Sequence, residues 1–144
     1  MPSRRLFEIC ANQNLLTVTP ETSVREAARR MSDRHVATVL VMTGEELVGI
    51  MSERDFVQRV IAPSLDPDVA TVGDVMSPNP YSVDANRNGT AALQMMNEHG
   101  IRHVVVRDLP GGGYGVVSMR DFISSEFAEA EKVEDIKQEL WEHV

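Results

Sequence analysis

Residues 49–55 read GIMSERD and residues 115–121 read GVVSMRD. Both stretches follow one frame, in which glycine, two apolar residues and serine precede any residue, an arginine and an aspartate. The apolar residues predict the end of a strand, and a serine followed three residues later by an acid is typical of a helix N-terminus. The chain of 144 residues therefore contains two copies of one strand-to-helix corner.

The sequence around each corner is duplicated as well. Residues of the first copy that precede its hairpin turn match residues 65 positions later, and residues that follow the turn match residues 66 positions later. Apolar residues at i, i+3, i+4 and i+7 predict one helix in each copy. Ser23 is the expected cap of the first helix and Asn88 that of the second, where Gly89 is expected to loosen the helix start. The aligned stripes are Val24, Ala27, Ala28 and Met31 in the first copy and Gly89, Ala92, Leu93 and Met96 in the second.

Each copy is predicted to be a β-α-β-β-α unit. A short strand near residues 17–18 or 81–83 precedes the helix, and β-branched residues at 36–41 and 101–106 open a hairpin. The glycine-rich turn at 109–113 is a hairpin turn, because no Gly-Lys-Ser/Thr follows it as in a phosphate-binding loop. After the corners, helices are expected to open on Phe56 and Phe122. One such unit exposes an apolar sheet face, and its twin is the nearest surface that can bury it.

Composition excludes several classes of protein. The net charge of −8, with no basic stripe, disfavours nucleic acid and anionic membranes as partners. Cys10 is the single cysteine, so no internal disulfide is possible, and the longest uncharged apolar run, residues 36–42, is too short to cross a bilayer. His99 and His103 are separated by a helix-to-strand boundary, so no metal site is predicted. A cytoplasmic protein is expected.

The duplicated unit resembles a known family. The corner occurs in matching register in both halves, residues 71–77 (TVGDVMS) lead into the second copy, and Ile101-Arg102-His103 open a strand. These features are similar to a tandem pair of cystathionine-β-synthase (CBS) domains, or Bateman module, standing alone without a fused effector domain. The resemblance implies a mixed α/β (α+β) fold in which two repeats pack through their sheets about a pseudo-twofold axis. The expected order is repeat 1 at 5–62, a linker at 63–70, repeat 2 at 71–127 and an acidic amphipathic C-terminal helix at 128–144.

Two interpretations of the corner follow from its residues. Ser52 with Asp55, and Ser118 with Asp121, have the spacing of a helix-capping pair. The same groups suit a nucleotide, because an ionised carboxylate can accept hydrogen bonds from both hydroxyls of a ribose. A serine hydroxyl and the N–H groups of a first helical turn can meet a phosphate nearby. Capping and binding are compatible, since one side chain can orient the helix and contact a ligand.

The resemblance implies which residues hold such a ligand: the aspartates hold ribose, the serines assist, and arginines at 54 and 120 are weaker phosphate candidates. Apolar residues at the strand starts would line a slot for the purine. The second repeat has Arg102 and His103 where the first has Ala37 and Thr38, so we expect a charged nucleotide to prefer one cleft. The candidate nucleotide-binding residues are Val18, Val36, Thr38, Ser52, Arg54, Asp55, Val83, Ile101, Arg102, His103, Ser118, Arg120 and Asp121.

The function implied by the resemblance is that of a non-catalytic regulatory or sensor module. It would bind AMP, ADP or ATP, with S-adenosylmethionine and NAD as further candidates, in clefts between the repeats, with no obligatory cofactor. No catalytic residues are expected, because no nucleophile lies beside a base; a small nucleotide-converting enzyme is a remote third reading. The alternative is a ligand-free module for homo-oligomerisation or protein interaction.

The partners expected are an adenosine-containing small molecule, a second copy of the chain in a homodimer of repeat pairs, and an unidentified effector protein. The C-terminal segment has an apolar stripe between acids and lysines, which predicts a helix that buries this stripe on its own domain or on a second chain, the second chain being favoured. The stripe residues are Ile123, Phe127, Ala130, Val133, Ile136, Leu140 and Val144, with Trp141 beside them.

Overall fold

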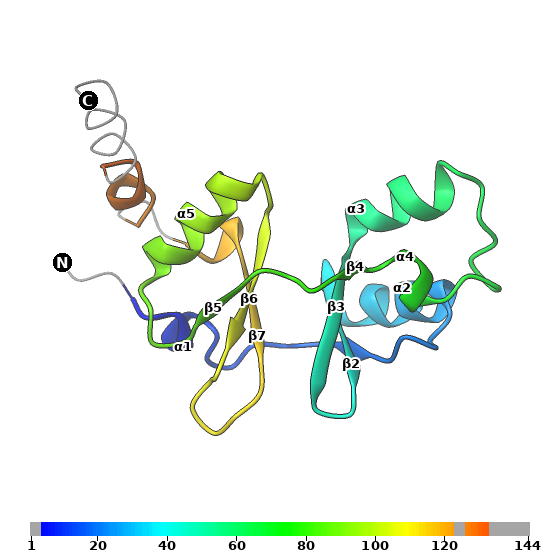
Figure 1. The fold of residues 1–144 in the computed structure, drawn as a ribbon, viewed down its shortest axis with the longest axis horizontal. Coiled ribbons are helices and arrows are strands. Elements are labelled where there is room, and N and C mark those ends of the chain that lie inside the picture. The colour runs from blue at the N-terminus through cyan, green and yellow to red at the C-terminus, as the bar shows by residue number, and fades with distance from the viewer. Residues whose placement is uncertain (1–3, 123–125, 133–144) are drawn as a thin grey trace. The chain divides into compact units, whose positions relative to one another are not determined.

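The computed structural model describes residues 4–122 and 126–132, which are drawn in colour in Figure 1. The chain divides into two compact units. The first-repeat unit is Asn14–Pro80, and the second-repeat unit combines Met1–Gln13 with Tyr81–Val144. Each unit is a mixed α/β structure with its own sheet and its own hydrophobic cluster. The N-terminal segment therefore folds with the second repeat, although it precedes the first repeat in the sequence.

The first-repeat unit contains a four-stranded sheet of order β1-β2-β3-β4. Strand β1 pairs in parallel with β2, while β2 with β3 and β3 with β4 are antiparallel. The β2–β3 turn contains Gly44 at φ 62°, as a tight hairpin requires. The elements are β1 (Thr17–Val18), α2 (Val24–Arg34), β2 (Thr38–Thr43), β3 (Glu46–Ser52), α3 (Glu53–Asp55), the π-helical η1 (Phe56–Ile61), α4 (Val72–Val75) and β4 (Ser77–Pro78).

The second-repeat unit contains a three-stranded sheet of order β5-β6-β7, again with one parallel and one antiparallel pair. The β6–β7 turn includes three glycines with φ between 85° and 92°, which confirms the predicted hairpin turn. Residues 126–132 are helical. The remaining elements are α1 (Leu6–Ile9), β5 (Ser82–Asp84), α5 (Gly89–His99), β6 (His103–Arg107), β7 (Gly115–Ser118) and the 3₁₀ turn η2 (Met119–Asp121).

The long helix of each repeat begins differently. Ser23 caps α2 as predicted, since its hydroxyl oxygen accepts a hydrogen bond from the Glu26 N–H at 3.1 Å. The predicted side-chain cap at Asn88 is wrong: its backbone has the N-cap conformation, but its side chain makes no capping hydrogen bond. The first N–H of α5, that of Gly89, instead donates to the Arg4 carbonyl at 2.8 Å. The first N–H of α2, that of Val24, likewise donates to a main-chain carbonyl, that of Ala70 at 2.9 Å. The two helices differ at the third N–H, which donates to the Ser23 hydroxyl in α2 and, from Ala91, to the Asn88 main-chain carbonyl at 3.0 Å in α5.

The segments after the two corners also differ. Phe56 opens η1, as expected for the first corner. Phe122 does not open a helix: its backbone is extended, with φ −102° and ψ 150°, so that prediction is wrong. Its ring is buried in the core of the second-repeat unit and meets the Phe127 ring at a centroid distance of 6.2 Å. Burial of this aromatic ring is the physical reason why the chain leaves the corner in an extended conformation.

Gly89 makes room for its neighbours. An added Cβ would lie 2.9 Å from Phe122 Cε1, 3.1 Å from Glu126 Oε2 and 3.2 Å from Ile9 Cδ1. All three distances are shorter than normal van der Waals contacts. The glycine thus permits close packing of three segments rather than loosening the helix start, as the sequence suggested.

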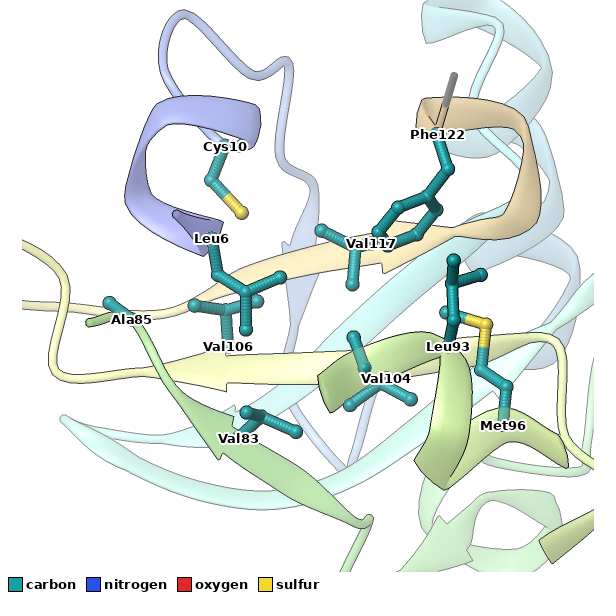
Figure 2. Packing of buried hydrophobic residues seen from close by; sticks show 11 residues of the cluster. Leu6, Cys10, Val83, Ala85, Leu93, Met96, Val104, Val106, Val117 and Phe122 are labelled. Carbon is teal, nitrogen blue, oxygen red and sulfur yellow. The ribbon is translucent and has the colours of Figure 1, made fainter. Parts of the chain in front are cut away.

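The core of the second-repeat unit joins α1 to the sheet and to α5. Figure 2 shows Leu6 of α1 and Cys10, the residue after α1, among the valines of β5, β6 and β7, with Leu93 and Met96 of α5 beside Val104. In the first-repeat unit, α2, α4 and the strands bury the equivalent cluster. No helix among the described residues is long and apolar enough to cross a bilayer. The tail beyond residue 132, including most of the predicted amphipathic stripe, lies outside the described residues.

Burial makes the Cys10 thiol unreactive. Desolvation, with a smaller contribution from the charge of Asp121, raises the pKa of Cys10 from 9.0 to about 11. At pH 8 we expect a disulfide reagent to modify the folded protein about a hundredfold more slowly than the urea-unfolded chain, because the thiolate is the nucleophile. Since the folded pKa is the higher one, the stability that the thiol contributes is present below pH 9 and is lost as the pH rises towards 11. Equal modification rates in the two states would contradict this assignment.

Candidate functional site

The first corner is fixed by one aspartate oxygen. Asp55 Oδ2 accepts hydrogen bonds from the Ser52 backbone N–H at 2.8 Å and from the Ser52 hydroxyl at 3.3 Å. The other carboxylate oxygen, Oδ1, lies 3.6 Å from Arg59 Nε, one helical turn further on. The Asp55 side chain is only 15% exposed. This carboxylate is therefore held on both of its oxygens.

The second corner repeats the same geometry in a more open setting. Asp121 Oδ2 accepts from the Ser118 backbone N–H at 2.7 Å and from the Ser118 hydroxyl at 3.4 Å. Asp121 is exposed, whereas its counterpart in the first repeat is half-buried. In both corners the serine also takes the N-cap position of the short helix or turn. The capping interpretation is thus confirmed, and capping by itself uses only Oδ2 of each carboxylate.

The register of the hairpins places other candidates beside the corners. Thr38 lies directly opposite Ser52, and His103 lies directly opposite Ser118. Side chains at directly opposite antiparallel positions have their Cβ atoms about 4.5–5.5 Å apart on one face of the sheet. Each unit therefore gathers the first residue of one strand and the serine of the corner at the same end of its hairpin.

The exposed arginines surround these positions without being fixed by the corner itself. Arg54 and Arg120 directly precede the corner aspartates in the sequence and are exposed. Arg102, next to His103, is exposed as well. Arginine presents a planar fork of donors that suits phosphate or carboxylate. The second-repeat unit therefore carries two cationic candidates near its corner, while the first repeat has Ala37 in place of Arg102.

The four apolar candidates fall into two groups. Val18 and Val83, which are 3% and 5% exposed, lie inside the two hydrophobic clusters. Val36 and Ile101 are partly exposed and pack on the edges of the same clusters. An apolar slot that accepts a ligand needs accessible surface, so Val36 and Ile101 are the members of this set that can supply it.

Sequence reasoning missed two arginines that contact the corner aspartates. Arg59 follows Asp55 by four residues, a spacing typical of helical ion pairs, and its Nη1 donates to the Val75 carbonyl at 2.9 Å. Arg4 Nη2 donates to the Asp121 carbonyl at 2.8 Å and to Glu126 Oε1 at 2.7 Å. The hydrogen bond to Glu126 raises the pKa of Arg4 above its already high usual value, so its charge is permanent. Arg59 could have been found from its spacing, whereas nothing in the local sequence indicates the contact between Arg4 and Asp121.

The histidines considered for metal binding have different surroundings. His99 stacks on Tyr81, with ring centroids 3.9 Å apart and an interplanar angle of 12°. His103 lies in β6 opposite the corner serine. Within residues 4–122 and 126–132, no three His, Cys, Asp or Glu side chains are grouped so that they could hold a metal ion. The arrangement of the site is that of a carboxylate with neighbouring cations.

Comparison with known proteins identifies the family of the chain. The family described as "CBS domain" matches residues 7–62 and again residues 72–127. A CBS domain-containing protein of Arabidopsis thaliana, CBSCBSPB3, is 32% identical over 111 residues, which is 77% of this chain but 20% of the plant protein. The chain therefore spans about a fifth of the length of that relative.

Solved structures resemble the chain over most of its length. An uncharacterized conserved protein from Pyrococcus horikoshii has a TM-score of 0.74 and 30% identity, covering 84% of this chain and 91% of its own. The CBS domain protein PAE2072 from Pyrobaculum aerophilum, solved as a complex with AMP, has a TM-score of 0.77 and 26% identity, covering 90% of this chain and 99% of its own. The chain belongs to the CBS domain family and carries a tandem pair of these domains, at residues 7–62 and 72–127.

Proposed function

We propose that this CBS pair is a non-catalytic regulatory module that binds an adenosine-containing ligand, with AMP the first candidate and ADP, ATP, S-adenosylmethionine and NAD the wider class. The observation that carries the proposal is the duplicated carboxylate, oriented by the serine N–H and placed beside strand-opening residues. The AMP complex of the relative from Pyrobaculum aerophilum supports the choice of ligand class.

The Asp121 corner is the better candidate for the first ligand. Asp121 is an exposed residue, whereas Asp55 is half-buried and its carboxylate pairs with Arg59. A ribose has two adjacent hydroxyl donors, and an ionised carboxylate accepts both. Arg102 and Arg120 bring positive charge for the phosphate, and Ile101 offers an accessible apolar edge for the purine. The same reasoning makes a phosphate-bearing nucleotide a better fit than adenosine alone.

A regulatory role requires that the ligand distinguish two states of the protein. A ligand shifts an equilibrium only by its difference in affinity for those states. We propose that occupancy of the corner changes the protein's assembly or its contact with an effector protein. This regulatory effect depends on ligand binding at the corner.

Calorimetric titration with AMP tests the site. Asp121→Asn should weaken AMP binding about 10-fold to 100-fold, because hydrogen bonds to a charged group contribute roughly 1.5–3 kcal/mol each. Asp74→Asn is the matched control: Asp74 accepts from the Thr71 N–H at 3.0 Å in the same capping geometry, yet lies outside both corners. The control should weaken a similar cap, because an amide oxygen is an uncharged acceptor, and it should keep wild-type affinity. The proposal fails if no adenosine compound of the class binds, or if Asp121→Asn binds AMP as tightly as the control.

The second candidate function is homo-oligomerisation without a ligand. It is favoured by four exposed apolar residues of the first-repeat unit that recur every four positions and are called the apolar strip here: Val57, Ile61, Leu65 and Val69, of which Val57 and Ile61 are 61% and 67% exposed. Large apolar side chains gathered on one surface are typical of interaction sites. Val60, between them in sequence, is buried, so η1 directs one side chain inward and its neighbours outward.

Sedimentation of an Ile61→Glu variant tests this second candidate. If a second copy covers the strip, the charge should shift the protein from dimer to monomer, since a carboxylate would be buried without a partner. Gln58→Glu is the control, because it adds the same charge at an exposed position of the same segment. An Ile61→Glu variant that sediments like the control would contradict the assignment. Retained AMP binding by the monomeric variant would separate assembly from ligand binding.

A further inference from the structure

The N-terminal segment is fastened across the second-repeat unit. The N–H groups of Leu6 and Phe7 donate to the carbonyls of Arg87 and Ala85 at 2.9 and 3.0 Å, and the Gly89 N–H donates to the Arg4 carbonyl. Figure 1 shows this segment, in dark blue, beside the elements that follow residue 80. The backbone of Arg4 is therefore held at the first turn of α5.

From this position the Arg4 side chain joins two further segments. Its Nη2 donates to the main-chain carbonyl of Asp121 and to Oε1 of Glu126, at 2.8 and 2.7 Å. A guanidinium NH₂ group has two N–H donors, so it can serve both acceptors at once. One side chain thus links the N-terminal segment, the end of the second corner and the helical residues 126–132.

The carboxylate of Glu126 lies in a site shaped to receive it. Glu126 is 2% exposed and is the only buried charged residue in the described part of the chain. Gly89 leaves the space for its Oε2, and the buried ring of Phe122 borders the same space. Figure 2 shows that ring above Val117 and Leu93 in the core. Because a buried charge is costly unless it is paired, the ion pair with Arg4 at 2.7 Å stabilises Glu126 in this position.

Asp121 is therefore anchored twice. Its side chain accepts from the Ser118 N–H, and its main-chain carbonyl accepts from Arg4. The first contact orients the carboxylate, and the second fixes the backbone that carries it. If the 126–132 helix leaves, Arg4 loses its ion pair with Glu126, and this ion pair no longer holds Arg4 at the Asp121 carbonyl.

We propose that Arg4 is a positioning residue for the Asp121 corner, and that through Glu126 it couples ligand binding at this corner to docking of the 126–132 helix. The coupling rests on the proposed function, in that the ligand is the one proposed for Asp121. Coupling is reciprocal: a docked helix strengthens ligand binding by the same factor by which the ligand strengthens docking. Ligand binding at the second corner is thereby transmitted to the 126–132 helix, which precedes the C-terminal segment in the sequence.

AMP titration and hydrogen–deuterium exchange of the full chain test the coupling. Arg4→Ala and Glu126→Gln should each weaken AMP binding about five-fold or more, the range of ordinary coupling between sites. AMP should slow amide exchange in residues 126–132 of the wild type, and this protection should disappear in Arg4→Ala. Arg5→Ala is the matched control, since Arg5 is the neighbouring arginine and donates to the Asn86 carbonyl, away from the corner. The control should keep both the affinity and the protection.

The outcomes are separable from those of the proposed function. If wild type binds AMP and both variants bind it equally well, or if AMP protects the helix in Arg4→Ala, the coupling is wrong. If wild type binds no nucleotide, the proposed function fails, and the coupling is judged without ligand: Glu126→Gln should speed exchange in residues 119–121, and unchanged exchange overturns it. Should Arg4→Ala fail to fold, as judged by its melting curve, Arg4→Lys replaces it, because lysine keeps the charge but lacks the fork.

Discussion

The hydrogen bond from a serine N–H to an aspartate three residues later is the interaction on which the rest of the structure depends. It closes the end of β3 at Ser52 and the end of β7 at Ser118, at 2.8 and 2.7 Å. The bond forms where each strand ends and a helical segment begins. It also orients a carboxylate at the end of a hairpin. The same atoms cap the helical segment and orient the carboxylate. A capping pattern and a binding pattern therefore cannot be told apart in the sequence.

Duplication has produced two corners that share the serine–aspartate hydrogen bond and differ in their surroundings. In the first, Arg59 approaches the free side of the Asp55 carboxylate, and the strand-opening residue is Thr38. In the second, the cation contacts the main chain of Asp121 instead of its carboxylate, and the strand opens on His103. A cation on the carboxylate competes with a ribose for it, whereas a cation on the carbonyl leaves it accessible. The two copies therefore share one scaffold, and the arginines outside the motif determine whether the corner carboxylate is paired with a cation.

Much of the fold could be predicted because its signals are local. The helix stripes, the Ser23 cap and the hairpin turns each lie within one or two neighbouring elements, and the structure has them as expected. The errors arose where a distant segment intervenes. The Asn88 side chain does not cap α5, where the Ala91 N–H donates to the Asn88 main-chain carbonyl and the Arg4 carbonyl accepts from the Gly89 N–H. Phe122 is extended because its ring is buried. The contact between Arg4 and Glu126 spans 122 residues, and no spacing rule reaches so far. Of the candidate site, the corner residues were accessible to sequence reasoning, while the arginine that fixes the second corner was not.

A crystal structure of the protein with AMP bound would show whether the Asp121 carboxylate holds the ribose. We expect the two ribose hydroxyls to donate to the carboxylate of Asp121 while Oδ2 keeps its bond from the Ser118 N–H. An AMP molecule ordered elsewhere, with the Asp121 carboxylate facing only water, would contradict it.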